Sequence, residues 1–264
     1  MKTIVNILQD KTTLKNIILA TTNYGYPEET ELTIDLLNNI DIKPRVLKNK
    51  EIQKERTKKR AEVFTPSWLC NQMNNFCDKE WFGRKDVFNI ECEKSWKTIE
   101  DKIVFPKEKT WQDYVLSTRL EITCGEAPYL VSRYDTATGE MIDVFKRVGM
   151  LDRKLRIVNE NTFNENDWFE WVKKAYKSIY AYEFQGDNLL IARINLLLTF
   201  VEYMNYKWGK EPTEEQLKEI AEIIIWNIWQ MNGLTNEIPF TNVYARIKDW
   251  EMENVICFKD LFLR

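Results

Sequence analysis

The chain of 264 residues contains no histidine at all. This absence excludes a histidine-based catalytic triad, a histidine-ligated metal and a histidine proton shuttle. The five cysteines are an odd number without a Cys-x-x-Cys pair, which argues against a disulfide framework and against a structural zinc site. We therefore expect no metal site from the cysteines, which are Cys70, Cys77, Cys92, Cys124 and Cys257.

Glycine and proline are scarce, with eight and seven residues, which leaves little room for low-complexity linkers. Most of the chain is therefore expected to be folded. No apolar run is long enough to span a bilayer, and the opening MKTIVNILQDKTTLKN lacks the apolar core and cleavage site of a secretory signal. We expect a cytoplasmic protein that does not interact with membranes.

The formal net charge of −3 gives no general attraction to nucleic acid. Basic side chains are nevertheless concentrated in residues 48–60, KNKEIQKERTKKR. This run is either a solvated helix end or linker, or a contact to phosphate groups. In the second case the candidate DNA contacts are Lys58, Lys59 and Arg60.

The first 60 residues are predicted to form a helical and basic N-terminal extension. Hydrophobic spacing predicts helices within residues 3–20 and 31–40. The following pair Thr65-Pro66 predicts a helix with Thr65 as its N-cap, because proline suits the first helical turn. Residues 61–264 are expected to form the main domain.

The main domain is predicted to alternate strands with helices. Residues 117–123 predict a strand that enters the turn at Cys124-Gly125, and residues 128–134 predict a short helix that leaves it. The segment SIYAYEF predicts a second buried strand, which ends in Glu183. A long helix, QGDNLLIARINLLLTFVEYMNY, is expected to follow directly.

The rest of the main domain combines an irregular stretch with two further helices and a strand. Residues 140–165 have no clean period and are expected to be irregular or partly helical, and Asp167 is the expected N-cap of the next helix. Thr213 caps a further predicted helix that stops at Gly233, and NVICF, residues 254–258, is a closing strand. This order of strands and helices predicts a doubly wound, Rossmann-like α/β sheet.

In such a sheet the ligand lies beyond the carboxyl ends of the strands. The turn from Glu121 to Gly125 offers backbone N–H groups there, and Glu183 offers a carboxylate for a ribose. Each feature alone has an ordinary structural explanation, as a simple turn or as a surface acid. Their occurrence in the right order favours a nucleotide-like cofactor.

Four segments resemble motifs of the N6-adenine-specific DNA methyltransferases of restriction–modification systems. AEVFTPSWLCNQM is similar to the Phe-Thr-Pro segment that precedes the family's core. LEITCGEAPYL resembles the first cofactor motif, IYAYEFQGDNLLIARINLLL the second, and ENVICFKDLF the third. The resemblance spans residues 61–262 in the family's order and implies a fold that binds S-adenosylmethionine.

The resemblance also implies roles for individual residues. Phe64, Thr65 and Pro66 would flank the methionine part of S-adenosylmethionine. Glu121, Cys124 and Gly125 would line the loop at its amino-acid end. Glu183 would take the ribose hydroxyls, and Asp260 would approach the adenine.

The chain departs from the family pattern in three ways. Ile122-Thr123 and Glu126-Ala127 replace the usual Pro-Ala and Ser-Gly, and residues 132–170 lengthen the first interval as an insertion. The Asn-Pro-Pro-Tyr catalytic motif is not found. The nearest fragment, residues 236–240, lies before the third motif and lacks the double proline.

Two functions follow from the resemblance and these departures. The first is an S-adenosylmethionine-dependent adenine-specific DNA methyltransferase, or the cofactor-binding part of a split one, in a restriction–modification or phage modification system. A second subunit would then supply the catalytic and target-recognition parts. The alternative is a catalytically inactive methyltransferase-like protein that binds DNA or a partner. No residue is assigned to catalysis.

Overall fold

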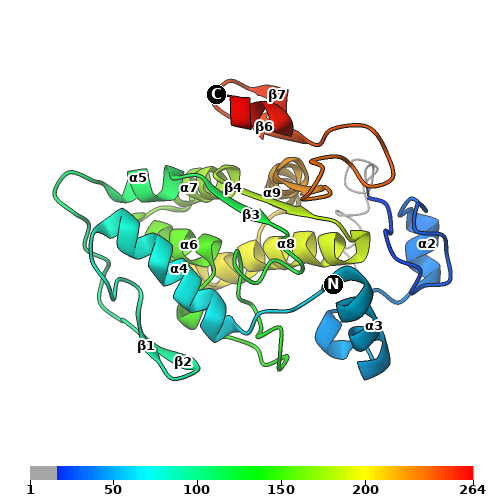
Figure 1. Ribbon diagram of the computed structural model, residues 1–264. Helices are drawn as coiled ribbons and strands as arrows, with labels where there is room; N and C mark the ends of the chain where they lie inside the picture. The colour runs from blue at the N-terminus through cyan, green and yellow to red at the C-terminus, as the bar shows by residue number, and fades with distance from the viewer. Residues whose placement is uncertain (1–16, 264) are drawn as a thin grey trace.

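A computed structural model describes residues 17–263 of the chain. Its centre is a parallel sheet of three strands, in the order β3 (Arg119–Ile122), β4 (Ile179–Glu183) and β5 (Ile228–Gln230). Two antiparallel hairpins lie outside this sheet, β1–β2 (Asn89–Cys92, Ser95–Thr98) and β6–β7 (Arg246–Asp249, Asn254–Cys257). Figure 1 shows the sheet strands running beside the long helix α8.

The helices make up most of the structure. They are α2 (Ile34–Asn39), α3 (Lys50–Arg60), α4 (Ser67–Phe82), α5 (Trp111–Leu116), α6 (Met150–Asn161), α7 (Glu165–Lys177), α8 (Gly186–Trp208) and α9 (Glu214–Asn227). Three short 3-10 helices are η1 (Arg45–Leu47), η2 (Val144–Lys146) and η3 (Phe258–Leu263). No helix within residues 17–263 is both long and apolar enough to cross a bilayer.

The two faces of the sheet are covered differently. Ile179, Ala181 and Ile228 belong to the main core, together with apolar residues of helices α4 to α9. On the other face, Tyr182 and Trp229 form a small cluster with residues of the segment 245–261. Hairpin β6–β7 therefore lies across the sheet from helices α6 and α8 (Figure 1). Among residues 17–263, the helices pack mainly on one face of this parallel sheet.

The predicted fold class is confirmed in its coarse form, a mixed α/β structure with parallel strands. A full doubly wound sheet is not formed by residues 17–263. The closing strand is present as β7, but it pairs antiparallel with β6 instead of joining the parallel sheet. The third parallel strand is β5, which lies in a segment that the sequence predicts as helix.

A buried asparagine decides where helix α9 ends. The side-chain amide of Asn227 donates to the carbonyl oxygens of Tyr176 and Ile179, at 3.0 and 2.9 Å. These contacts tie the end of α9 to the start of β4, so the following residues enter the sheet. The prediction of one helix up to Gly233 was therefore wrong beyond Asn227, whereas its cap at Thr213 is confirmed by a capping box with Gln216.

Other predicted helix starts also differ. Helix α4 begins after Pro66, and its first N–H, at Ser67, donates to Asp135 at 2.7 Å, so Thr65 is not the cap. The cap of α7 is Asn164, whose side chain accepts from the backbone of Asp167. In both helices, a residue other than the expected cap accepts hydrogen bonds from the first backbone N–H groups.

Two predicted segments need correction, and a third is confirmed. Residues 128–134 form turns instead of a short helix. The stretch 140–165 is partly helical, as expected, because it contains the buried helix α6. Residues 17–20, the end of the first predicted helix, are not helical, and the extended segment around Ile18 forms a bridge with Glu31. Residues 3–16 of that helix lie outside the described residues.

The extended N-terminal segment packs closely on the first turn of α8. A β-carbon added at Gly186 would lie 2.1 Å from the carbonyl oxygen of Ile18, which is far inside contact distance. We expect Gly186→Ala to lower the free energy of unfolding by about 2 kcal/mol, because the backbone must shift to admit the methyl group. Chemical denaturation measures this loss. Asn205→Ala, on the exposed end of α8, is the control and should change stability by less than about 0.5 kcal/mol.

Candidate functional site

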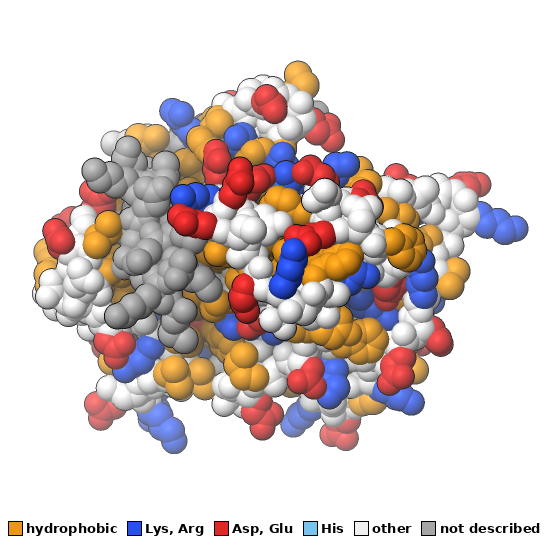
Figure 2. Space-filling model, turned by 180° about the vertical axis from the view of Figure 1, so that it is seen from behind, with side chains coloured by type: hydrophobic (Ala, Val, Ile, Leu, Met, Phe, Trp, Pro, Cys, Tyr) orange, Lys and Arg blue, Asp and Glu red, His pale blue; other side chains and the backbone are white. Residues whose placement is uncertain are grey.

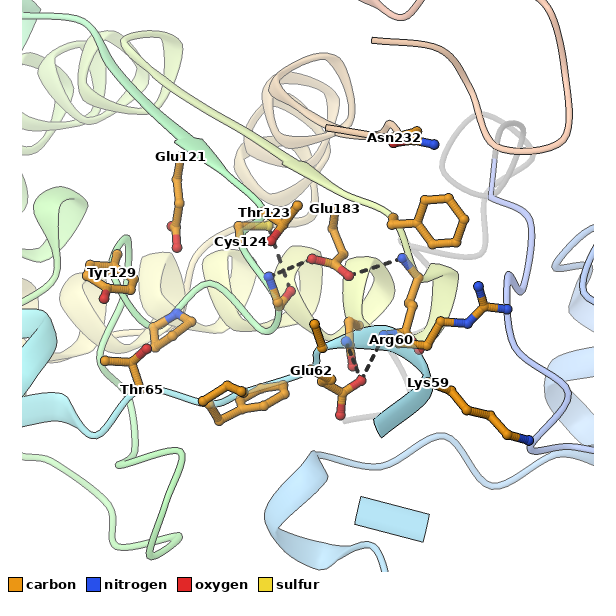
Figure 3. A pocket seen from close by; sticks show the side chains of 18 of the residues that line it. Lys59, Arg60, Glu62, Thr65, Glu121, Thr123, Cys124, Tyr129, Glu183 and Asn232 are labelled. Carbon is orange, nitrogen blue, oxygen red and sulfur yellow. Dashed lines mark hydrogen bonds between the residues drawn. The ribbon is translucent and has the colours of Figure 1, made fainter. Parts of the chain in front are cut away.

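A cleft of about 490 Å³ opens at the carboxyl ends of the three parallel strands. Its wall is formed by the segment that links α3 to α4, by the loops after β3 and β4, and by Asn232 after β5. Figure 3 shows Glu62, Thr65, Glu121 and Glu183 around one space, with Asn232 and Lys59 farther out. The lining residues are Lys58 to Thr65, Glu121, Thr123 to Gly125, Pro128, Tyr129, Glu183 to Gln185, Asn188 and Asn232.

The turn after β3 is held against the end of β4. The backbone N–H of Cys124 donates to the carbonyl of Tyr182, and that of Gly125 donates to Glu183 Oε2, both at 2.8 Å. Gly125 has a φ of +57°, and a β-carbon there would lie 3.6 Å from the ring of Phe64. Glycine is therefore favoured at this position by backbone conformation.

Glu183 is held in place at the end of β4. Its side chain is only 5% exposed, and Oε1 accepts from the backbone N–H of Gln185 at 3.1 Å. Burial raises the pKa of Glu183, while the N–H groups of Gln185 and Gly125 favour its ionised form. Each carboxylate oxygen accepts one bond from the protein and keeps a second acceptor position for a ligand.

Glu121 carries one of the buried, unsatisfied polar atoms of the cleft. Its Oε2 atom is inaccessible to solvent and has no hydrogen-bond partner among the described residues. Burial raises the pKa of Glu121 well above its usual value, and the nearby charge of Glu183 raises it further. The pair of carboxylates therefore favours a bound positive charge.

The unusual Glu126-Ala127 pair does not obstruct the cleft. Glu126 is 1% exposed and turns away, accepting from the N–H of Arg45 at 2.5 Å and from the hydroxyl of Tyr134 at 2.6 Å. Ala127 has a φ of +66°, a conformation that costs alanine about 1 kcal/mol. The extra carboxylate thus serves to attach the segment around η1.

The opposite wall depends on an ionic network beneath it. Asp187, at the start of α8, is buried and pairs with Arg56 through both oxygens and with Lys48 at 2.8 Å. Arg56 also donates to Glu62, which lines the cleft and accepts from Gln185 at 2.9 Å. These contacts attach α3 and the segment after it to α8.

The basic residues lie at the rim of the same cleft. Lys58 and Lys59 are exposed, and Lys59 pairs with Glu55 one turn earlier. Arg60 pairs with Glu28 and lies over the ring of Phe184, 5.6 Å from its centre. Figure 3 shows Lys59 and Arg60 at the outer side of the cavity. On the face seen from behind the view of Figure 1, acidic and basic side chains are intermixed (Figure 2).

Most of the predicted site residues meet in this cleft. The structure brings together Lys58, Lys59, Arg60, Phe64, Thr65, Glu121, Cys124, Gly125 and Glu183. Pro66 precedes α4 and does not line the cleft. Asp260 lies in η3, on the hairpin side of the sheet, and does not line it either.

Sequence reasoning missed several lining residues. Glu62 lies two residues before Phe64 of the Phe-Thr-Pro segment, and Phe184 directly follows the strand-terminal acid, so proximity in the chain was an available signal. Asn232 follows β5, a strand that the sequence did not predict. Within residues 17–263, no group of three or more Asp, Glu or Cys side chains is placed to hold a metal ion.

Comparison of the chain with protein-family models, with curated proteins and with solved structures gives no match in any of the three. The methyltransferase resemblance therefore depends on the motifs of this chain alone.

The isolation of Glu121 has a measurable consequence for stability. The folded-state pKa of Glu121 is raised, so above about pH 4.5 its carboxylate ionises more readily in the unfolded chain than in the folded protein. The wild-type protein therefore loses stability as the pH rises above this value. We expect Glu121→Gln to raise the free energy of unfolding by roughly 1 kcal/mol at pH 8, with the gain disappearing toward pH 4. Urea denaturation across this pH range measures the difference.

Glu202→Gln is a control of opposite sign. Partial burial acts to raise the pKa of Glu202, but its bonds to Arg133 and Arg147 hold it below the usual value. This variant should lose stability at neutral pH and match the wild type in acid. A pH-independent effect of Glu121→Gln would contradict the assignment of an unpartnered charge.

Proposed function

We propose that the cleft binds S-adenosylmethionine and that the chain is the cofactor-binding part of an adenine-specific DNA methyltransferase. The observation that carries the proposal is the placement of Glu121 and Glu183 near the carboxyl ends of the neighbouring parallel strands β3 and β4, with one oxygen of Glu121 unpartnered among the described residues. S-adenosylmethionine offers an ammonium group and a sulfonium for these charges and a ribose diol for Glu183.

The cleft suits the parts of this cofactor. Its volume falls within the range of about 300–1,000 Å³ that small-molecule sites occupy. Phe64 packs on the turn at Gly125, so the ring and the turn form one wall along which the methionine part would lie. Phe184 follows the proposed ribose acceptor and contacts Phe240 edge to face at 6.1 Å, which offers an aromatic surface to a purine.

DNA is the proposed partner of the loaded cleft. The bound cofactor would supply an electrophilic methyl group, and the chain's own residues would orient it toward the rim. Lys58 and Lys59 are exposed at this rim, where phosphate groups of a nucleic acid could be contacted. A second subunit carrying the catalytic and target-recognition parts is proposed to complete the activity.

A methyltransferase-like protein that binds DNA or a partner without methyl transfer is the second candidate. The fragment that most resembles the catalytic motif, residues 236–240, lies in the loop between β5 and β6. Its Phe240 contacts Phe184 at the cleft, but no double proline accompanies it. This observation favours cofactor binding without a complete catalytic set.

Calorimetric titration of the chain with S-adenosylmethionine and with its demethylated product tests the proposal. We expect micromolar binding at pH 7.5, with release of protons because a cationic ligand favours ionised Glu121. Titration in two buffers of different ionisation enthalpy measures this release. Absence of binding at millimolar ligand would refute cofactor binding. Labelled methyl in the adenine of added DNA would distinguish the two candidates.

A further inference from the structure

The outer edge of strand β3 has no strand beside it among the described residues. The sheet ends there, since β4 lies on the other side of β3. The N–H of Arg119 donates toward β4, to the carbonyl of Ser178. Backbone groups alternate along a parallel strand, so those of Leu120 and Ile122 point away from β4. This edge therefore presents unpaired donors and acceptors.

Apolar side chains accompany the free edge. Leu120 and Ile122 pair in register with Tyr180 and Tyr182, so they lie on the face that large helices do not cover. They are 41% and 44% exposed, and Leu116, just before the strand, is 49% exposed. Parallel strands are normally buried on both faces, so an exposed apolar edge of this kind indicates a missing neighbour.

A second cleft adjoins the start of this edge. It has a volume of about 570 Å³ and is lined by Leu116 and Thr118 just before β3, by the end of α7 and the start of β4, and by hairpin β6–β7. Leu116, Thr118 and Tyr180 form its floor, and Ile256 and Leu261 form part of its wall. The apolar strip of β3 therefore continues into a cavity that could hold the end of an added segment.

The charges of this cleft favour an acidic occupant. Lys174, Lys177 and Lys248 line it. Two acids, Asp249 and Glu251, also line it. The side chain of Asp249 accepts hydrogen bonds from the backbone N–H groups of Glu251 and Met252 in the hairpin turn. The lining thus carries three lysines, whose ammonium groups lie over tryptophan rings, and two acids, one of which is already engaged by the protein. An acidic end of an incoming segment would balance the remaining positive charge.

We propose that the edge of β3 is the docking site for one extended segment of another polypeptide. This segment adds a strand to the sheet, alternates apolar residues that cover Leu120 and Ile122, and places acidic residues in the lysine-lined cleft. A second copy of the chain fits less well. Its own β3 has only four residues and begins with Arg119, so it brings no acid to the lysines. The inference does not depend on cofactor binding.

A synthetic peptide tests the docking site on the full chain. The probe is a fluorescein-labelled nine-residue peptide that begins with two glutamates and then alternates valine with threonine. We expect saturable binding by anisotropy, weakened roughly tenfold by Leu120→Lys, which loses most of one buried leucine contact. Val104→Lys, at an apolar residue with 70% exposure outside this surface, is the matched control and should bind like the wild type.

Two further measurements separate strand addition from unspecific contact. Amide hydrogen exchange at Leu120 and Ile122 should slow when the peptide is bound, because their N–H groups become paired. Lys174→Glu with Lys177→Glu should weaken the acidic peptide and improve binding of a peptide that begins with two lysines. Unchanged exchange, equal binding by Leu120→Lys, or a dimer of the chain that Leu120→Lys dissociates would each overturn the proposal.

Discussion

Replacing Glu183 by glutamine is expected to weaken S-adenosylmethionine binding by about 100-fold. Both oxygens of Glu183 are oriented by backbone N–H groups, of Gly125 and Gln185, and each keeps one acceptor position for a ribose hydroxyl. Glutamine replaces one acceptor oxygen by an NH₂ donor and removes the charge from the other, so both ribose bonds are weakened or lost. A hydrogen bond to a charged acceptor contributes about 1.5 kcal/mol, and about 1.4 kcal/mol corresponds to a factor of ten. Calorimetric titration at pH 7.5 measures the change.

The control for Glu183→Gln is Asp260→Asn. The family resemblance places Asp260 near the adenine, whereas the structure places it in η3 and outside the lining of the cleft. We therefore expect Asp260→Asn to bind the cofactor like the wild type. Equal binding by Glu183→Gln and the wild type would show that the ribose acceptor is another residue, even if the chain binds the cofactor.

Replacing Asp187 by asparagine is expected to cost about 3–5 kcal/mol of unfolding free energy. Asp187 is fully buried and receives hydrogen bonds from Tyr24, Lys48 and Arg56. Neutralising Asp187 leaves the buried cations Lys48 and Arg56 without their main partner. Removing one partner of a buried ion pair lowers the free energy of unfolding by about this amount. Burial acts to raise the pKa of Asp187, but Lys48 and Arg56 hold it below the usual value.

The lowered pKa gives the sign of the pH dependence. The contribution of Asp187 is present above its unfolded-state pKa and is lost as the pH falls through the folded-state pKa. The stability difference between Asp187→Asn and the wild type should therefore shrink in strong acid. Urea denaturation at several pH values measures it.

Two comparisons test the role of the Asp187 network. Asp35→Asn, at an exposed position in α2, should change stability by less than about 0.5 kcal/mol. The double variant Arg56→Met with Asp187→Leu should recover part of the loss, because it removes both charges of the main pair. If Asp187→Asn unfolds at the same denaturant concentration as the wild type, the network does not hold α3 against α8.

The structure links this network to the proposed site. Arg56 bonds to Asp187 on one side and to Glu62, in the cleft wall, on the other. A variant that loosens α3 is therefore expected to weaken cofactor binding without touching the ligand. The Asp260→Asn variant should do neither, which separates the two effects.

Short-range patterns were sufficient for a large part of this protein. The strand ending in Glu183, the long helix α8 and the Thr213 cap depend on residues that are neighbours in the chain, and all three are confirmed. The absence of histidine and the odd cysteine count likewise needed only the composition. The two halves of the cleft, the turn at Gly125 and the acid at Glu183, were visible as motifs because each is local.

Other features depend on residues far apart in sequence. Asp135 accepts from the first N–H of α4, and the contacts of Asn227 with the start of β4 end helix α9. An apolar run such as IIIWNIWQM is compatible with helix and strand alike, so only the neighbouring β4 decides that its end is β5.

The sequence by itself thus determined which local elements and which acidic and glycine residues are available. The tertiary structure alone decided that Glu62 joins the cleft, that Asp260 does not, and that Glu121 has a carboxylate oxygen without a partner within residues 17–263. Burial and charge pairing depend on every segment that packs around a group. Hydrophobic periodicity and capping patterns report only a residue's neighbours along the chain, so they carry no information about these contacts.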